Sequence, residues 1–366
     1  MQKSALELLT VADSERWSTL VVHSATPDVY YLPAYVHATA EIEHTEPVAV
    51  VAGQDSCRLL APLLVRKMTA GVNGSENAPG DVSGIQWSDA CSPYGYGGLL
   101  PLSNSQTVDA DSLRYFFDDL RGWCSSRDLV CCVLRLHPLM NQAEWFLQEE
   151  PWQKDLKIDL RGSTVAIDLG RWDDARDCPD GMRKGRRSDL NVARRDLRVT
   201  WTSGEDLDVG LNLDRFLALY EQAMENHGAA GFYKFPPEYF SRLASLEQRF
   251  SIAFAWLGDQ LAGASIFLAG RDYAHYHLAA GNELGMKHKA ATLLLVEGAK
   301  WARRQGCKLL HLGGGVSPGD SLEDFKRSFG TELYRYAYLV MVTDPERFEQ
   351  LCQLPNAPWP YNVSRT

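Results

Sequence analysis

The sequence has no long apolar run and no recognisable metal-binding pattern. Its longest apolar stretches are of strand length and fall well short of the ~20 residues needed to cross a bilayer. None of the eight cysteines belongs to a Cys-x-x-Cys motif or to a Cys/His cluster with zinc spacing. The opening residues carry acidic side chains early and do not resemble a signal peptide. We therefore expect a cytoplasmic protein with buried, reduced thiols, no metal and no cofactor.

A surplus of basic charge is also missing. The net charge of −10 excludes a large, nonspecific nucleic-acid surface, which needs a basic face, but leaves room for a small basic groove. With 366 residues, of which 45% are hydrophobic, the chain is long enough for two domains. We expect domains at residues 1–162 and 163–343, the second carrying the reactive site, and a tail at 344–366 that is irregular or packs back. A polar loop at residues 70–83 and a crossing at 155–162 mark the expected breaks.

The two halves share one order of predicted elements, which indicates an internal repeat. In the second half, apolar runs with short polar turns predict a three-strand meander, then a helix and a further strand, at residues 251–256, 261–268, 273–279, 291–305 and 308–312. The corresponding segments of the first half are residues 47–52, 57–65, 94–100, 113–125 and 129–136, and a helix precedes each meander at 30–40 and 216–224. We therefore predict an α/β fold of the α+β type, with two lobes that each contain a mixed, largely antiparallel sheet flanked by helices.

Three glycines, Gly313, Gly314 and Gly315, directly follow the last of these strands. They lie at the carboxyl end of a strand that follows a helix, which is where ligands bind in open α/β sheets. One interpretation is a plain flexible turn; the other is a substrate-binding turn whose exposed amides face a carbonyl or phosphate group. The spacing is not that of a dinucleotide-binding fingerprint, since no helix opens on these glycines.

A short helix with one charged residue on its apolar face is expected after the glycines. Ser321 and Asp324 have capping-box spacing, and Gly330 ends the helix. The predicted buried face consists of Leu322, Phe325, Lys326 and Phe329, and the predicted outward positions are Glu323, Asp324, Arg327 and Ser328. An ammonium group on a buried face is costly unless it meets an anion or developing negative charge. Lys326 therefore extends to solvent, pairs with a structural carboxylate, or stabilises an oxyanion in acyl transfer, which is the hypothesis that we favour.

Other candidate residues form basic and aromatic groups. Residues 183–198 are predicted to form a basic helix, in which Arg183 and Arg187 either bind phosphate or belong to a solvated face with interleaved aspartates. Candidates for substrate binding occur at a glycine-rich turn, in a loop interrupted by Gly and Pro, and along one strand face: Tyr94, Tyr96, His227, Tyr233, Lys234, His275 and His277. A structural packing role is the alternative for each of them. No Ser-His-Asp order stands out, so a triad hydrolase is not supported.

Four segments together resemble the Fem family of aminoacyltransferases, of the peptidoglycan-bridge type, within the GNAT-like acyltransferase superfamily. These segments are SPYGYGGLL, FLALYEQAMENHGAAGFYKFPPEYF, LLLVEGAKWARRQGCKLLHLGGG and DSLEDFKRSFG. The resemblance implies two GNAT-like lobes and the transfer of an amino acid from aminoacyl-tRNA to an amine, often on a peptidoglycan precursor. It also implies catalytic roles for Phe325 and Lys326, and substrate or phosphate binding near Tyr94, Tyr96 and residues 227–234. The chain departs from the family in having only a short basic segment in place of a long helical arm that grips tRNA.

The expected donor follows from a second departure. GNAT enzymes that use acyl-CoA hold its pyrophosphate with a Gly-rich turn, whereas the matching residues 287–292, KHKAAT, contain no glycine. Lys287 and Lys289 can still meet phosphate there. We expect aminoacyl-tRNA to be the donor, and an amine of a peptide, amino sugar or metabolite to be the acceptor, in a monomer or homodimer. The alternatives are an acyl-CoA-dependent N-acyltransferase and a non-catalytic binding protein on the same fold.

Overall fold

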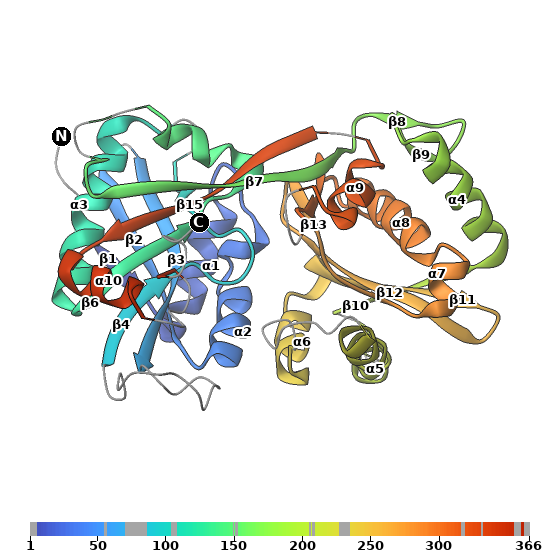
Figure 1. Ribbon diagram of the computed structural model, residues 1–366, viewed down its shortest axis with the longest axis horizontal. Coiled ribbons are helices and arrows are strands. Elements are labelled where there is room, and N and C mark those ends of the chain that lie inside the picture. The colour runs from blue at the N-terminus through green and yellow to red at the C-terminus, as the bar shows by residue number, and fades with distance from the viewer. Residues whose placement is uncertain are drawn as a thin grey trace. The chain divides into compact units, whose positions relative to one another are not determined.

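The chain folds into two compact units, and it passes between them more than once (Figure 1). The computed structural model describes residues 6–54, 57–69, 86–103, 108–148, 150, 153–204, 206, 209–226, 235–315, 319–330, 332–354 and 360–361. Unit 1 consists of residues Met1–Ala25, Thr39–Arg161 and Tyr336–Thr366, and unit 2 of Thr26–Ala38 and Gly162–Arg335. The expected loop at residues 70–83 and the candidates His227, Tyr233 and Lys234 lie outside the described residues.

This division differs from the linear one expected from the sequence. Residues Thr26–Ala38 belong with the second unit, and the chain returns to the first unit from Tyr336 onward. Residues 155–162 were expected to be a break, but most of them lie in the long strand β7 (Leu156–Asp168), so no new strand begins at Ser163. Helix α2 (Pro33–Glu43), strand β7 and strand β15 (Glu332–Val342) each contain residues of both units.

Unit 1 contains a mixed sheet in the order β1-β2-β3-β4-β6-β15. All neighbours in this order are antiparallel except β4 and β6, which are parallel. Apolar residues of β2, β3, β6 and helix α3 form its core, in which Phe116 and Phe117 are fully buried. The elements are β1 (Glu7–Leu9), α1 (Ser14–Val22), β2 (Glu46–Gln54), β3 (Cys57–Thr69), β4 (Gln86–Cys91), β5 (Leu100–Pro101), α3 (Ala110–Ser126), β6 (Leu129–Arg135) and α10 (Pro345–Cys352).

The strands of unit 2 follow the order β7-β14-β13-β12-β11-β10, in which only β13 and β14 are parallel. Helix α8 packs on one face of this sheet, and helices α5 and α6 lie on the other (Figure 1). The elements are β8 (Trp172–Asp173), β9 (Cys178–Pro179), α4 (Lys184–Asp196), β10 (Arg198–Ser203), α5 (Val209–Asn226), α6 (Pro237–Ala244), β11 (Phe250–Leu257), β12 (Gln260–Ala269), β13 (Tyr273–Gly281), α7 (Glu283–Lys287), α8 (Ala290–Arg304), β14 (Leu309–Gly313) and α9 (Ser321–Arg327).

The predicted repeat is present, with one error. In both units an antiparallel meander is followed by a helix and then by a strand parallel to the meander's last strand. The segment 94–100 was predicted as the third strand of the first meander, but that place belongs to β4, and only Leu100–Pro101 forms a short strand. Trp123 and Trp301 occupy matching positions before β6 and β14, and both side chains are buried.

None of the described helices is both long and apolar enough to span a membrane. All eight cysteines are free, and seven of them are buried. Burial raises the pKa of thiols such as Cys307, to about 12, because the thiolate is poorly solvated. Buried thiols with a raised pKa, such as Cys307, are therefore packing residues rather than nucleophiles.

Candidate active site

The helix that carries Lys326 begins one residue earlier than the sequence suggests. Asp320 is the N-cap of α9, and its Oδ1 accepts a hydrogen bond of 2.7 Å from the backbone N–H of Glu323. The Glu323 carboxylate in turn accepts from the N–H of Gly319 at 2.7 Å. The capping residues are thus Asp320 and Glu323, and the predicted pair of Ser321 and Asp324 is wrong.

The buried face of α9 also differs from the predicted one. Lys326 and Phe329 are buried as expected, but Leu322 is 40% exposed. Glu323 and Ser328, predicted to point outward, are buried. The Glu323 carboxylate accepts a hydrogen bond from the N–H of Gly319 and forms an ion pair with Arg327, and these two contacts keep it buried. A helix of seven residues offers too little apolar surface to override such bonds.

Lys326 places an ammonium group in a nearly water-free position beside the glycine turn. Its side chain is only 8% exposed, and Nζ donates a hydrogen bond of 2.6 Å to the carbonyl oxygen of Gly314. Burial lowers the pKa of Lys326 to about 8, while the charge of Asp320 partly opposes that shift. Because the cation faces a carbonyl oxygen here, it is able to stabilise negative charge that develops on a carbonyl oxygen next to it.

Close backbone approach explains the glycines better than flexibility does. Gly313 ends β14 with a φ of +74°, a region that disfavours residues with a side chain. A Cβ atom added to Gly315 would lie 2.3 Å from Oδ1 of Asp320, the atom that caps α9. The glycine turn and the helix are therefore fitted to each other. Substrate binding by Gly313, Gly314 and Gly315 stays a prediction.

Arg186 of α4 joins α9 to the start of α8. Its guanidinium lies 4.6 Å from the ring centre of Phe325, and Nε donates to Oγ of Ser328 at 3.0 Å. Nη1 reaches Asp189 at 2.9 Å and the hydroxyl of Thr292, in the first turn of α8, at 3.3 Å. Arg186 was not among the residues predicted from the sequence, although it continues the helical spacing of the buried residues Leu190 and Ala193.

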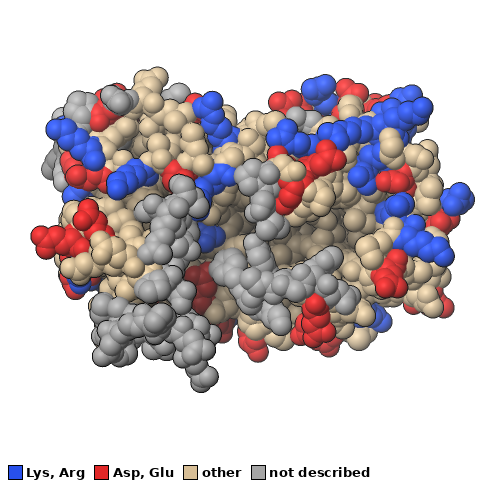
Figure 2. Space-filling model, in the orientation of Figure 1, with Lys and Arg blue, Asp and Glu red and all other residues tan. Residues whose placement is uncertain are grey.

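The basic helix α4 is largely engaged within its own unit. Figure 2 shows Lys and Arg side chains gathered over the part of unit 2 that carries α4, with acidic side chains between them. Arg183 pairs with Asp324 of α9 at 2.7 Å, and Arg187 donates to the carbonyl of Met182. Phosphate binding by Arg183 and Arg187 stays a prediction, and it requires an incoming phosphate to compete with these contacts.

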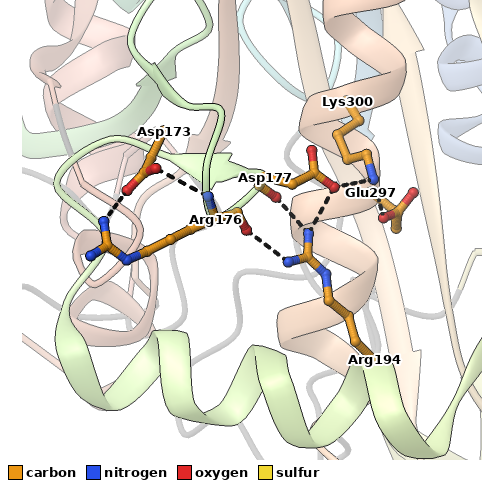
Figure 3. Close-up of polar contacts among 6 residues, drawn as sticks. All are labelled: Asp173, Arg176, Asp177, Arg194, Glu297 and Lys300. Atoms are coloured by element: carbon orange, nitrogen blue, oxygen red, sulfur yellow. Dashed lines mark hydrogen bonds and ion pairs between the residues drawn. The ribbon is translucent and has the colours of Figure 1, made fainter.

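Arg194 of α4 belongs to an ion-pair network that connects three elements of unit 2. Asp177, in the turn between β8 and β9, lies between Arg194 of α4 and Lys300 of α8, at 3.1 and 2.8 Å (Figure 3). Lys300 also pairs with Glu297, and Arg176 pairs with Asp173 in the same turn (Figure 3). The network connects α4, the β8–β9 turn and α8, so this part of the basic helix stabilises the fold.

The two histidines of β13 have structural partners. His275 Nε2 lies 2.8 Å from Oδ2 of Asp28, and both side chains are buried. His277 Nε2 lies 2.8 Å from the hydroxyl of Tyr239, and burial lowers the pKa of His277 to about 3. A neutral imidazole with so low a pKa is a poor proton acceptor near neutral pH. Neither contact tests the predicted substrate-binding role of these residues.

The remaining candidates lie apart from α9 in the chain. Tyr94 and Tyr96 belong to unit 1 and are half-buried, and the ring of Tyr96 packs edge-on against Tyr336 with 5.0 Å between centroids. Lys287 and Lys289 are exposed at the junction of α7 and α8. Lys289 has a φ of +61° and precedes the first turn of α8. Their roles in substrate and phosphate binding stay predictions.

Comparisons with known proteins agree with this fold. Residues 180–327, from the start of α4 to the end of α9, match the acetyltransferase (GNAT) domain family. The solved structure of FemX covers 94% of this chain and 99% of its own, with a TM-score of 0.69 and 11% identity. No curated protein matches the chain.

Two further solved structures have the same fold. The C-terminal domain of a putative lysylphosphatidylglycerol synthetase from Agrobacterium fabrum covers 95% of this chain and 98% of its own, with a TM-score of 0.57 and 11% identity. A protein of unknown function from Bacteroides thetaiotaomicron covers 92% and 99%, with a TM-score of 0.58 and 10% identity. The predicted architecture is thus confirmed: two tandem GNAT-like lobes with the fold of FemX, the second of which includes the segment similar to the acetyltransferase (GNAT) domain family, with Lys326 near its end.

Proposed function

We propose that this protein transfers an aminoacyl group from aminoacyl-tRNA to an amino group of a peptide, amino sugar or metabolite. The observation that carries the proposal is the buried ammonium of Lys326, 2.6 Å from the Gly314 carbonyl oxygen at the carboxyl end of β14. A buried cation is costly, and a structural role would call for a carboxylate partner. FemX and a putative lysylphosphatidylglycerol synthetase share this fold, which supports the transfer of an aminoacyl group rather than an acetyl group.

The chemistry requires one carbon–nitrogen bond to form and one ester carbon–oxygen bond to break. The acceptor amine attacks in its neutral form and creates a tetrahedral intermediate with a negatively charged oxygen. Lys326 donates a hydrogen bond to that oxygen, and Phe325 on the same helix packs against Arg186 and keeps the helix in place. The intermediate collapses to the amide, and the amine proton leaves with the ribose hydroxyl or with solvent. The low pKa of His277 makes it unsuitable as the base in this step.

The start of α8 supports an RNA ester over a thioester of CoA. Ala290 is buried, and the Cβ of Ala290 would lie only 3.2 Å from a Cβ added at Gly263 of β12, so the helix start is packed against the sheet. Residues 287–292 contain no glycine that would allow the close backbone approach a pyrophosphate needs, whereas single phosphates of RNA can be met by the exposed Lys287 and Lys289.

The direct test is a transfer assay with charged tRNA and a panel of amines. Wild-type protein is expected to form an amide product, and Lys326→Met to lose turnover about a hundred- to thousandfold while it keeps its circular-dichroism spectrum. Lys326→Arg, which keeps a cation, serves as the matched variant and is expected to retain part of the activity. Near-normal turnover in Lys326→Met would exclude the proposed role of this residue.

An acyl-CoA-dependent N-acyltransferase is the second candidate, because the family that matches residues 180–327 is one of acetyltransferases. Thermal unfolding with acetyl-CoA separates the two candidates. A ligand at 100 times its dissociation constant stabilises the folded state by about 2.7 kcal/mol, which raises the unfolding temperature by several degrees. We expect no such shift; a saturable shift together with acetyl transfer would favour the CoA-dependent reaction.

A further inference from the structure

Unit 2 contains a cavity of about 370 Å³ that does not include Lys326 or the glycine turn. It is lined by Arg198 and Thr200 of β10, Asn212 and Arg215 of α5, Trp256 of β11, and Asp259 of the following turn. Arg198 and Trp256 are direct neighbours in the β10–β11 ladder. Asn212 and Arg215 lie three residues apart on α5 and so point to the same side.

The cavity combines fixed aromatic surface with available positive charge. Trp256 Nε1 donates to the hydroxyl of Thr200 at 2.9 Å, which holds the indole ring in place. The Arg215 guanidinium lies 5.8 Å from the Trp256 ring centre and donates to Oδ1 of Asn212 at 3.1 Å. Within the described residues, neither Arg198 nor Arg215 forms an ion pair, in contrast to Arg186 and Arg194 of α4.

The cavity lies at the same end of the sheet as the start of α8. In the ladder, Leu257 of β11 is opposite Gln260 of β12, and Gly263 of β12 is opposite Gly281 of β13. Ala290, the first residue of α8, packs against Gly263 at this end. The exposed Lys287 and Lys289 precede that helix, which packs on the face of the sheet opposite α5, so these lysines and the cavity share an end of the sheet but not a face.

We propose that this cavity binds a nucleotide, with the phosphate at Arg198 and Arg215 and the base against Trp256. A guanidinium group donates two parallel hydrogen bonds to phosphate oxygens, and both aromatic rings and guanidinium groups stack on nucleotide bases. The Asp259 carboxylate is an acceptor for ribose hydroxyls, and the volume is within the range of small-molecule sites. The inference rests on the proposed function only in supposing a nucleotide-bearing donor, since the adenosine end of charged tRNA and CoA both supply this chemistry.

A second cavity in unit 2 provides the matched control. It has a volume of about 500 Å³, includes Arg303 and Lys308 in its lining, and lies near the start of β14, at the opposite end of that strand from Lys326. Arg303 lies 4.7 Å from the ring centre of Trp172 and thus forms an arginine–tryptophan pair like that of Arg215 and Trp256. Its lysine is paired with Asp272 at 3.0 Å. If nucleotides bound to any arginine–tryptophan pair, they would bind at both the Trp256 pair and the Trp172 pair.

The test is isothermal titration of the full chain with AMP, CoA and a short RNA that ends in CCA. We expect saturable binding of AMP and of one of the two larger ligands, and the larger ligand that binds identifies the source of the nucleotide. The double variant Arg198→Gln, Arg215→Gln is expected to weaken binding about tenfold or more, and Trp256→Leu about fivefold to 150-fold. Arg303→Gln is expected to bind like wild type.

Three results would overturn the inference: no binding of any of the three ligands at millimolar concentration, unchanged binding by the double variant, or an equal loss in Arg303→Gln. Because Trp256→Leu also removes the bond to Thr200, the exposed Arg198→Gln single variant checks the cavity without disturbing the ring. Titration of Lys326→Met separates this inference from the proposed function. That variant is expected to bind the nucleotide normally, so loss of turnover and loss of binding are independent outcomes.

Discussion

Each unit contains a cation that is largely shielded from water, and these two cations face different partners. In unit 1, Arg66 of β3 forms two hydrogen bonds of 2.7 and 2.8 Å with Asp89 of β4, whose side chain is fully buried. Asp89 also accepts from the hydroxyl of Tyr361 at 2.9 Å. In unit 2, Lys326 faces a backbone carbonyl oxygen instead. The neighbouring Cys91 and Asp89 raise the pKa of Arg66 against the opposing effect of burial, whereas burial lowers the pKa of Lys326 to about 8.

This difference separates a structural charge from one available for chemistry. Arg66 is neutralised by its carboxylate, so it connects β3 and β4 and has little electrostatic effect beyond them. Lys326 donates its hydrogen bond to a peptide carbonyl and is only partly stabilised by the more distant charge of Asp320, so its charge remains available to a second oxygen. The turns that follow β6 and β14, the corresponding strands of the two units, also differ in what occupies them. After β6, the side chain of Gln142 fills the turn and accepts from the N–H groups of Leu99 and His137, whereas after β14 the chain continues into glycines.

Removing the structural cation is expected to give the largest change in stability. Arg66→Met leaves the buried Asp89 carboxylate without its guanidinium, and we expect a loss of about 3–5 kcal/mol in the free energy of unfolding, measured with urea. Lys67→Met, at the exposed neighbouring position of the same strand, is the control and should change stability by less than about 0.5 kcal/mol. Similar effects of the two substitutions would show that Arg66 is not a structural charge.

Removing Lys326 is expected to have the opposite effect on stability. Its pKa falls from 10.5 to about 8 on folding, so below pH 8 the folded state carries a charge that it disfavours by about 3 kcal/mol. Lys326→Met should therefore be more stable than wild type at pH 7, by up to that amount. Between pH 8 and 10.5 the unfolded chain binds the extra proton, so wild-type stability rises with pH and the difference narrows. Urea unfolding of both proteins at pH 7 and 10 measures this, and a less stable variant at pH 7 would contradict it.

The position of the Lys326 ammonium group also depends on Arg186, which holds α9 in place. Arg186→Met removes the contacts with Ser328 and Thr292 that connect α9 to α8, and we expect turnover to fall about tenfold at saturating substrate. The effect should fall on kcat rather than KM, and Arg186→Lys should restore part of it. Arg195→Met, on the exposed side of the same helix, is the control. A change in KM alone would indicate substrate binding instead of positioning.

The smallest effect is expected at the glycine turn. Gly315→Ala brings a methyl group against the capping oxygen of Asp320 and should cost about 1 kcal/mol of stability. Gly185→Ala, in α4, has open space around the added atom and should raise stability by about 0.4–1 kcal/mol. Thermal unfolding of the two variants tests whether the turn needs close approach. Equal and small effects would favour the plain flexible turn.

The sequence predicted what depends on local periodicity. The meander, α8, β14 and the burial of Lys326 follow from apolar spacing within single segments, and all four are present. The cap of α9 was misplaced by one residue because Asp320 and Ser321 are both good capping residues, and only the contact of Glu323 with Gly319 decides between them.

Long-range contacts could not be predicted in this way. Gly270 approaches Asp28 so closely that an added Cβ would lie 2.9 Å from the Cα of Asp28, and this approach places Thr26–Ala38 in unit 2. The bond from Tyr361 to Asp89 joins residues that are 272 positions apart. Neither contact leaves a periodic signal, because each depends on where distant segments meet.

The ionisation of Lys326 tests the comparison of the two cations most directly. The rate at which acetic anhydride modifies each lysine, followed by mass spectrometry between pH 6 and 11, reports the pKa of each amine. Lys326 is expected to titrate near 8, and the exposed Lys67 on β3 serves as a reference within the same protein. A pKa of Lys326 near 10.5 would contradict the account, because the amine would then be solvated or paired with a carboxylate, as Arg66 is.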